Sequence, residues 1–461
     1  MGKRQLVIAS TIVLVVAAAG IAAWAALRAR EQPEWTTDSP AALAEMRLGM
    51  EASQKYYWQE ANGHFAKALE LDPHFAMALR MLMRTTESKE RRAELRRRLA
   101  AVDRTRLSPR EAFLVEYTLA QAAEAPREKL DAIVADYLRQ HPRDPYALAQ
   151  QADLCWETSR WDDAEKTFQK LLAIEPNWVD AQNKMGYLSM ALGRFAESED
   201  RFRTYRFIAP DQANPHDSLG ELLVLTGRFD EAQRELETGL RIRPDFCQSY
   251  VNLMQIARLS GHPERMGALV ATIEKESCGP DFAVAAKCVN ELWQRYVARD
   301  WPRMAAIFQE PCVREHGIGV VLPHLAAVLQ GDLALARQME AFEAKQRSRY
   351  NTPGNPTVPH TAAIREVAEG NLADALKNFA ATDAQLQYRG LEGGIFKMYN
   401  RLQWAHALEL SGDKAGAERL VREVAAVNKA MAGRYAGLPA PQLPSAAARP
   451  AGRAAGSAKA S

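Results

Sequence analysis

One short phrase returns at a fixed interval in this sequence. It reads GRFDEAQREL from Gly227 to Leu236, GRFAESEDRF from Gly193 and SRWDDAEKTF from Ser159, so that successive copies start 34 residues apart. A fixed period of this size is typical of repeat proteins, in which one supersecondary unit is copied and stacked. The period therefore constrains the fold more strongly than composition does.

Within the phrase, apolar residues have helical spacing. Phe229, Ala232 and Leu236 stand at i, i+3 and i+7 and would share one face of a helix, with charged residues on the other faces. Each copy thus opens with an aromatic residue, has a small residue in the middle and closes with a bulky one. The corresponding sets are Trp161, Ala164, Phe168 and Phe195, Ser198, Phe202.

A proline follows each phrase at the same interval, and proline cannot continue a helix. Upstream of each phrase lies a second helical stretch that carries a small residue once per period. The prolines are Pro142, Pro176, Pro210 and Pro244, and the small residues are Ala152, Gly186 and Gly220. The predicted unit is therefore helix, turn, helix, turn, and the predicted fold class is all-α.

These positions resemble the tetratricopeptide repeat (TPR) family. The matching residues are Leu48, Gly49, Ala61, Phe65, Ala68, Pro73, Ala152, Ala164, Phe168, Pro176, Gly186, Phe202, Pro210, Leu219, Gly220, Ala232 and Pro244. Clear copies cover residues 42–75 and 145–246, with a further copy at 111–144 and a divergent one at 76–110. The resemblance implies a right-handed α-solenoid of stacked hairpins.

The repeat pattern weakens after Pro244 but continues. RDWPRMAAIF, GDLALARQME, GNLADALKNF and GDKAGAERLV keep a small or flexible residue at the same offset. The expected organisation is an anchor or signal segment (1–30), a linker (31–41), partly divergent TPR-like repeats (42–144), a regular array (145–278), degenerate hairpins (279–349), a Pro/Gly loop (350–360), C-terminal hairpins (361–432) and a disordered tail (433–461).

The N-terminus predicts one transmembrane helix. Residues 6–27 contain no charged residue and are long enough to span a bilayer. The alternative is a cleaved signal peptide with a small-x-small site at Ala23 and Ala25. We favour an uncleaved single-pass anchor because the apolar run is long. The basic residues on its two sides give a slight preference for repeats on the extracytoplasmic, periplasmic side.

Five cysteines bear on the compartment. Cys247 and Cys278 flank one expected hairpin, and Cys288 and Cys312 bracket the next, so two hairpin-closing disulfides are geometrically possible. We favour the alternative, thiols that never pair. Cys155 falls inside a helix, as a small core residue. The cysteines lack Cys-x-x-Cys spacing and have no histidines at zinc-ligand intervals, so we expect no metal site.

No catalytic motif occurs in the sequence. It lacks a Gly-x-x-x-x-Gly-Lys phosphate loop, a His-Glu-x-x-His metal motif and a Gly-x-Ser-x-Gly nucleophile motif, and GLEGGIF at residues 390–396 does not fit a dinucleotide fingerprint. Its nine histidines are scattered; His216 and His406 are expected to be structural or solvated. We therefore expect no enzyme activity and no cofactor.

The TPR resemblance implies that the first helix of each hairpin lines a concave groove. It assigns to this groove the residues Asp153, Trp156, Asp180, Lys184, Tyr187, Asp217, Glu221, Asn252, Gln255 and Arg258. Trp and Arg are favoured anchors at binding sites, so Trp156, Lys184 and Arg258 are the strongest candidates. The alternative is an ordinary polar helix face with Trp156 partly in the core.

Other features narrow the expected partner. TPR arrays that bind chaperone tails use a lysine, asparagine and arginine clamp, and this chain has Ala149, Asp153, Asn214 and Ser218 at the corresponding positions. Residues 89–106 carry eight basic and three acidic residues; a solvated helix face explains them better than a lipid or nucleic-acid site. The net charge of +2 does not favour nucleic-acid binding.

The phrase NPHDSLGELLVLTGRFDEA also resembles arrays attached to bacterial serine/threonine kinases and adenylate cyclases. The expected function is a membrane-anchored adaptor or scaffold, bacterial in origin, that binds a protein or peptide. The alternative is a noncatalytic assembly subunit of a cell-envelope enzyme or export complex.

Overall fold

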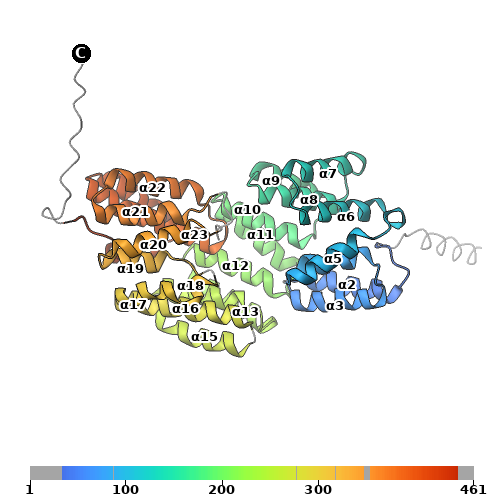
Figure 1. Cartoon of the computed structure of the whole chain (residues 1–461), viewed down its shortest axis with the longest axis horizontal. Coiled ribbons are helices and arrows are strands. Elements are labelled where there is room, and N and C mark those ends of the chain that lie inside the picture. The colour runs from blue at the N-terminus through green and yellow to red at the C-terminus, as the bar shows by residue number, and fades with distance from the viewer. Residues whose placement is uncertain (1–33, 87, 277, 317, 347–353, 445–461) are drawn as a thin grey trace, which may run out of the picture. The chain divides into compact units, whose positions relative to one another are not determined.

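Helices alone build the described part of the chain (Figure 1). The computed structural model describes residues 34–444 apart from 87, 277, 317 and 347–353, and no strand occurs among them. The predicted all-α fold of helical hairpins is confirmed. The transmembrane helix predicted within residues 6–27 lies outside the described residues. No helix among the described residues is long and apolar enough to cross a bilayer.

The chain divides into two units, Met1–Thr158 and Ser159–Ser461. The division falls inside the array that the sequence predicted as continuous over residues 145–278. The helices of the first unit are α2 (Pro40–Gln54), α3 (Trp58–Leu71), α4 (Ala76–Thr85), α5 (Lys89–Ala100), η1 (Arg104–Arg106), α6 (Pro109–Ala122), α7 (Arg127–Gln140) and α8 (Pro145–Glu157).

The first unit has one core that runs from Trp35 to Leu154. Trp35 is only 3% exposed, and the amide and hydroxyl of Thr36 both donate to the Glu111 carboxylate at 2.6 Å. Residues 34–39 therefore pack against the unit, although the sequence predicted a linker over residues 31–41. Burial of the indole and the buried Glu111 acceptor account for the difference.

The second unit holds the remaining helices. They are α9 (Trp161–Ile174), α10 (Val179–Ala191), α11 (Phe195–Ile208), α12 (Ala213–Leu225), α13 (Phe229–Ile242), α14 (Gln248–Ser260), η2 (Pro263–Arg265), α15 (Met266–Lys275), α16 (Pro280–Ala298), α17 (Trp301–Ala306), η3 (Ile307–Gln309), α18 (Pro311–Arg314), α19 (Val321–Leu329), α20 (Leu333–Glu343), α21 (Thr357–Glu369), α22 (Leu372–Gln385), α23 (Gly390–Ser411), α24 (Lys414–Val427), α25 (Lys429–Ala432) and η4 (Tyr435–Gly437).

The hairpins of the second unit close by packing a small residue against a bulky one. Gly186 on α10 faces the ring of Phe202 on α11, which is fully buried. A Cβ added to Gly186 would lie 2.4 Å from Phe202 Cε1, closer than real contacts allow. The small residues read from the sequence therefore let the two helices of a hairpin approach closely.

Two boundaries differ from the prediction. Helix α21 begins at Thr357, inside the loop predicted over residues 350–360. Residues 433–444, which the sequence assigned to a disordered tail, pack against α14 and α23. There Gln403 Nε2 donates to the Pro439 carbonyl at 2.9 Å, and His406 Nε2 donates to that of Pro441 at 3.0 Å. These side chains satisfy the carbonyls of a proline-rich stretch, which has few amides of its own for pairing.

Two disulfides join helices of the second unit. Cys247 pairs with Cys278 across the α14–α15 hairpin, with Cα atoms 5.7 Å apart, and Cys288 on α16 pairs with Cys312 on α18 at 6.2 Å. Cys155 belongs to neither disulfide and is buried in α8. Of the two alternatives left open by the sequence, the structure therefore contains the paired form.

Candidate partner-binding face

Four predicted groove residues form a polar ladder on the first helices of successive hairpins. Tyr187 on α10 donates its hydroxyl to Glu221 Oε2 on α12 at 2.6 Å. One repeat further, Asn252 on α14 donates to Asp217 Oδ1 on α12 at 3.0 Å. The partners are 34 and 35 residues apart, so each repeat contributes to the same side. We call the side of α10, α12 and α14 that carries these residues the inner face.

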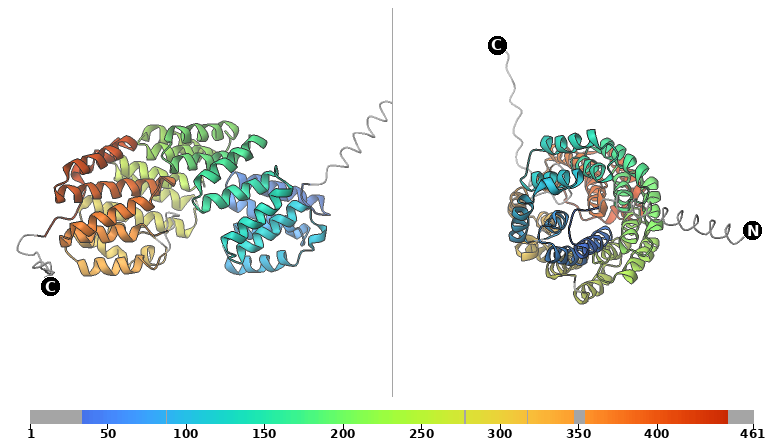
Figure 2. Two further views of the ribbon diagram at one scale, coloured as in Figure 1. Left: turned by 90° about the horizontal axis from the view of Figure 1, so that it is seen from above. Right: turned by 90° about the vertical axis from the view of Figure 1, so that its right-hand side faces the viewer.

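The inner face is covered by the C-terminal end of the same unit. In Figures 1 and 2, α23 lies beside α12 although their colours differ, and both helices contribute to one apolar cluster. Leu391, Ile395 and Met398 from α23 are buried in this cluster. The amide of Leu391, in the first turn of α23, donates to Glu221 Oε1 at 2.5 Å. Glu221 thus caps the positive end of α23.

The residues after α23 cap the helices of the inner face from their other end. Asn428 Nδ2 donates to the carbonyls of Val224 and Leu225 at 3.3 and 3.0 Å, in the last turn of α12. Arg434 donates to the carbonyls of Arg258 and Leu259 at 2.9 and 2.6 Å, in the last turn of α14. Such terminal carbonyls have no partner within their own helix. The contact therefore consists of helix capping together with apolar packing.

The ladder holds two neighbouring acidic groups. Burial and the nearby Glu221 raise the pKa of Asp217 to about 7, against hydrogen bonds from Ser249 and Asn252. Burial likewise raises the pKa of Glu221. Both carboxyl groups contact neutral donors of the chain, which gives them a structural role in this state. Such perturbed pKa values are also common at functional sites.

The structure corrects the accessibility expected for several groove residues. Asp217 is 3% exposed and Asn252 is 1% exposed, so neither side chain is available to a partner in this state. The guanidinium of Arg258, predicted as an anchor, stacks on the ring of Trp293 at 4.4 Å, and burial and Arg434 lower its pKa to about 10. Arg258 is thus part of the packing beneath α23–α25.

The other predicted groove residues are half-buried. On α10, Lys184 Nζ lies 2.8 Å from Asp180 Oδ2, an ion pair within one helix. Gln255 lies on α14. Asp153 and Trp156 lie on α8, in the first unit. The structure thus gathers Tyr187, Asp217, Glu221 and Asn252 and leaves Asp180 and Lys184 at the edge of this group.

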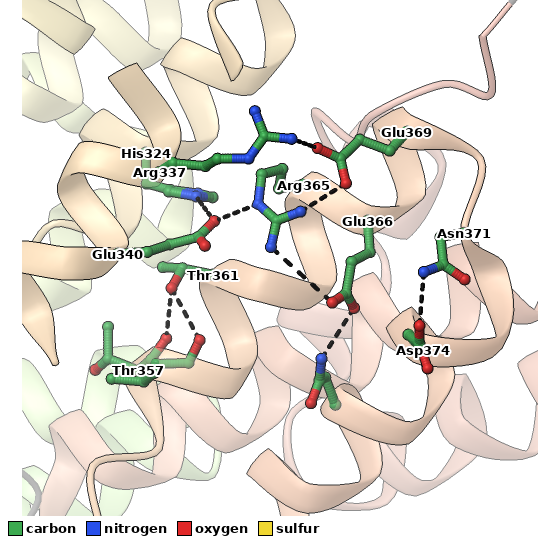
Figure 3. A network of polar contacts seen from close by, with 12 residues as sticks. His324, Arg337, Glu340, Thr357, Thr361, Arg365, Glu366, Glu369, Asn371 and Asp374 are labelled. Carbon is green, nitrogen blue, oxygen red and sulfur yellow. Dashed lines mark hydrogen bonds and ion pairs between the residues drawn. The ribbon is translucent and has the colours of Figure 1, made fainter. Parts of the chain in front are cut away.

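A second polar cluster runs through the four consecutive helices α19, α20, α21 and α22 (Figure 3). Glu340 accepts hydrogen bonds from His324 at 3.0 Å and from Arg365 at 2.8 Å, and Arg365 also pairs with Glu369 at 2.6 Å. Although burial opposes ionisation, His324 and Arg365 hold the pKa of Glu340 below its ordinary value. Opposite charges meet directly, so the network fixes neighbouring hairpins to one another.

Other predicted residues have structural contacts. Within the basic stretch, Arg92, Arg96 and Arg98 donate to the carbonyls of Thr86, Ala122 and Pro73. His216 contacts Glu235 at 2.7 Å across the α12–α13 hairpin. Among the described residues, no group of three or more His, Cys, Asp or Glu side chains is arranged to hold a metal ion.

The residues that cover the inner face were missed in the sequence. Asn428 and Arg434 are more than 170 residues from their partners, and no local pattern marks such a pairing. The sequence held one indication of this contact, the glycine-rich stretch GLEGGIF, which forms the start of α23. Its small residues permit close approach to α12: a Cβ added to Gly394 would lie 2.5 Å from Leu225 Cδ1.

No protein-family model matches the chain, and no curated protein is significantly similar to it. Solved structures with similar folds include PilW, a type IV pilus biogenesis factor, at 17% identity and TM-score 0.33, covering 49% of this chain and 87% of that one. The Cut9–Hcn1 hetero-tetramer of the APC/C has 15% identity and TM-score 0.44, covering 86% and 75%. A tetratricopeptide repeat protein from Parabacteroides merdae has 14% identity and TM-score 0.36, covering 65% and 98%. These values are too low to carry a functional argument.

Proposed function

We propose that this chain is a noncatalytic, membrane-anchored scaffold of TPR type that binds a protein or peptide partner. The observation that carries the proposal is that the inner face already holds a polypeptide. Glu221 accepts a main-chain amide, and the last-turn carbonyls of α12 and α14 accept side chains of the bound segment. A face that offers these groups recognises a helix by its backbone as well as by apolar contact.

The compartment belongs to the same proposal. An apolar segment at residues 6–27 would anchor the chain, with the repeats on the extracytoplasmic side. The disulfides Cys247–Cys278 and Cys288–Cys312 support this assignment, because disulfides persist in oxidising compartments. The similarity to kinase- and cyclase-linked arrays remains a prediction from the sequence.

The test is a crosslinked capture from membranes. Wild type is compared with an Asp180→Ala, Lys184→Ala variant, which changes half-buried groove residues of the second unit and leaves the stacked Arg258 in place. The matched control is Lys166→Ala, Lys170→Ala on the exposed side of α9. We expect the groove variant alone to lose a discrete partner. Equal capture by all three proteins would contradict binding through these residues.

The assembly-subunit alternative is favoured by the covered inner face, because a permanent structural part does not need a vacant groove. Detergent extraction separates the two proposals. A stable complex of fixed stoichiometry that survives the groove substitutions supports the assembly subunit, whereas a partner lost on those substitutions supports the adaptor.

A further inference from the structure

The C-terminal contact with the inner face differs from the contacts between consecutive hairpins. Three of its hydrogen bonds, from Leu391, Asn428 and Arg434, join residues 170–204 positions apart. We propose that α23–α25 form a latch over the inner face. When the latch opens, it exposes this face to a partner helix of the same chemical kind as the start of α23.

The latch can open without unfolding the hairpins that carry it. Helix α23 also packs against α22 and α24, its neighbours along the chain, through contacts separate from those with α10 and α12. Asn428 and Arg434 act on last-turn carbonyls, which water can satisfy when the segment leaves. Opening therefore exposes the apolar cluster and the ladder while the hairpin packing remains.

The groups that meet Glu221 also fit a contact that opens, and Asp217 beside it is bonded within the array. Asp217 is held by Ser249 and Asn252, and Glu221 by Tyr187 and the Leu391 amide. From α23 the nearby charged group is Glu392, which has the same sign as Glu221. Neutral donors stabilise a buried carboxylate less than a cation does. The contact between Glu221 and α23 is therefore weaker than the ion pairs around Arg365.

The part of the inner face that α23 occupies defines which kind of helix a partner must present. Glu221 requires free amides at a helix N-terminus, and the approach to Leu225 requires a small residue where α23 has Gly394. Aliphatic residues corresponding to Leu391 and Ile395 fill the apolar cluster. The geometry thus fits an amphipathic helix that begins with small residues.

The first test is hydrogen–deuterium exchange on the full chain, which needs no partner. Gly394→Leu blocks the latch, and Gly267→Leu is the matched control because an added Cβ at Gly267 meets nothing within 4 Å. Arg434→Ala is a milder second variant. The Arg434 side chain is exposed, so its truncation removes two hydrogen bonds and little packing.

We expect Gly394→Leu and Arg434→Ala to speed exchange in α25 and the first turn of α23 by about tenfold, equivalent to about 1.4 kcal/mol. Exchange in α19–α22 should stay at the wild-type rate, as in Gly267→Leu. Unchanged exchange in both latch variants would overturn the proposal. Equal acceleration in α19–α22 would also overturn it, because the latch would then not open separately.

The second test uses a peptide of residues 388–411, the natural occupant of the site, added to the full chain. This test rests on the proposed function, whereas the exchange experiment does not. We expect the Gly394→Leu protein to bind the peptide at least about tenfold more tightly than wild type does. A peptide carrying Gly394→Leu should bind neither protein. Equal binding to both proteins, or to neither, would contradict the assigned partner while leaving the exchange result intact.

Discussion

Two carboxyl groups of the second unit, the half-buried Glu340 and the buried Asp217, show opposite behaviour. Glu340 meets His324 and Arg365, which hold its pKa below the ordinary value against burial, whereas burial raises the pKa of Asp217 to about 7 among neutral donors. The first group lies between α19, α20 and α21, and the second lies in the ladder, where its partners Ser249 and Asn252 belong to α14. The difference indicates that charge pairs join the hairpins of α19–α22, while neutral hydrogen bonds join the helices of the inner face.

The largest expected effect tests the charge pairs. Arg365→Met would leave Glu340 without its cation in a partly buried site and would leave Glu369 with Arg337 alone, so we expect a loss of about 3–5 kcal/mol in the free energy of unfolding. Denaturant unfolding measures it. Arg422→Met, at an ion pair whose side chains are 70% and 71% exposed, is the control and should change little. Equal losses from both substitutions would contradict a larger contribution of the Arg365 charge pairs to the free energy of unfolding.

The next effect concerns the two disulfides, which link helices between α14 and α18. They close loops with sequence separations of 31 and 24 residues, so each should contribute about 3 kcal/mol. We expect reduction to speed hydrogen exchange in α14–α18 more than in α19–α22. Thiol labelling of denatured protein should find four more reactive cysteines after reduction than before. Equal labelling would show that the pairs do not form in the cell.

A smaller effect concerns pH. Folding raises the pKa of Asp217 from its ordinary 3.8 to about 7, so the folded state binds the proton more tightly than the unfolded chain does. The resulting stabilisation is complete below the unfolded pKa and is lost as pH rises through about 7. We expect Asp217→Asn to flatten this decline in the free energy of unfolding, measured by denaturant titration at several pH values. An unchanged slope would contradict the environment assigned to Asp217.

Glu340 should give a pH dependence of the free energy of unfolding that is opposite in sign to that of Asp217. Its folded pKa lies below the ordinary value, so its stabilisation is present above the unfolded pKa and is lost as pH falls through the folded pKa. Glu340→Gln should therefore reduce the loss of stability in acid. The two substitutions together separate the contribution of the ladder from that of the charge pairs.

Local features were predictable from the sequence because they repeat. The 34-residue period located the helical hairpins, and Gly186 and Phe202 pack together as the alternation of small and bulky residues indicates. The pairing of Tyr187 with Glu221 follows the same period. A repeated pattern reports on neighbours one period away, and these contacts are of that kind.

Long-range features were not predictable in this way. The period contains no information about Asn428 reaching α12, or about Arg434 reaching α14, because these contacts cross many repeats. Arg258 was predicted as an anchor although its guanidinium stacks on Trp293; these residues are about one period apart, but the repeat pattern weakens after Pro244 and does not mark Trp293. The stretch before Pro444 appeared disordered because its composition does not reveal Gln403 and His406, which pair with its carbonyls.

The central claim is that the inner face binds a protein partner in competition with α23–α25. The most direct measurement compares crosslinked capture of one identified partner by wild type, by Gly394→Leu, and by Gly394→Leu combined with Tyr187→Phe and Glu221→Gln. We predict about tenfold more capture by Gly394→Leu than by wild type, and loss of the gain when the ladder is removed. Equal capture by all three proteins would contradict the claim and would assign partner binding to another surface.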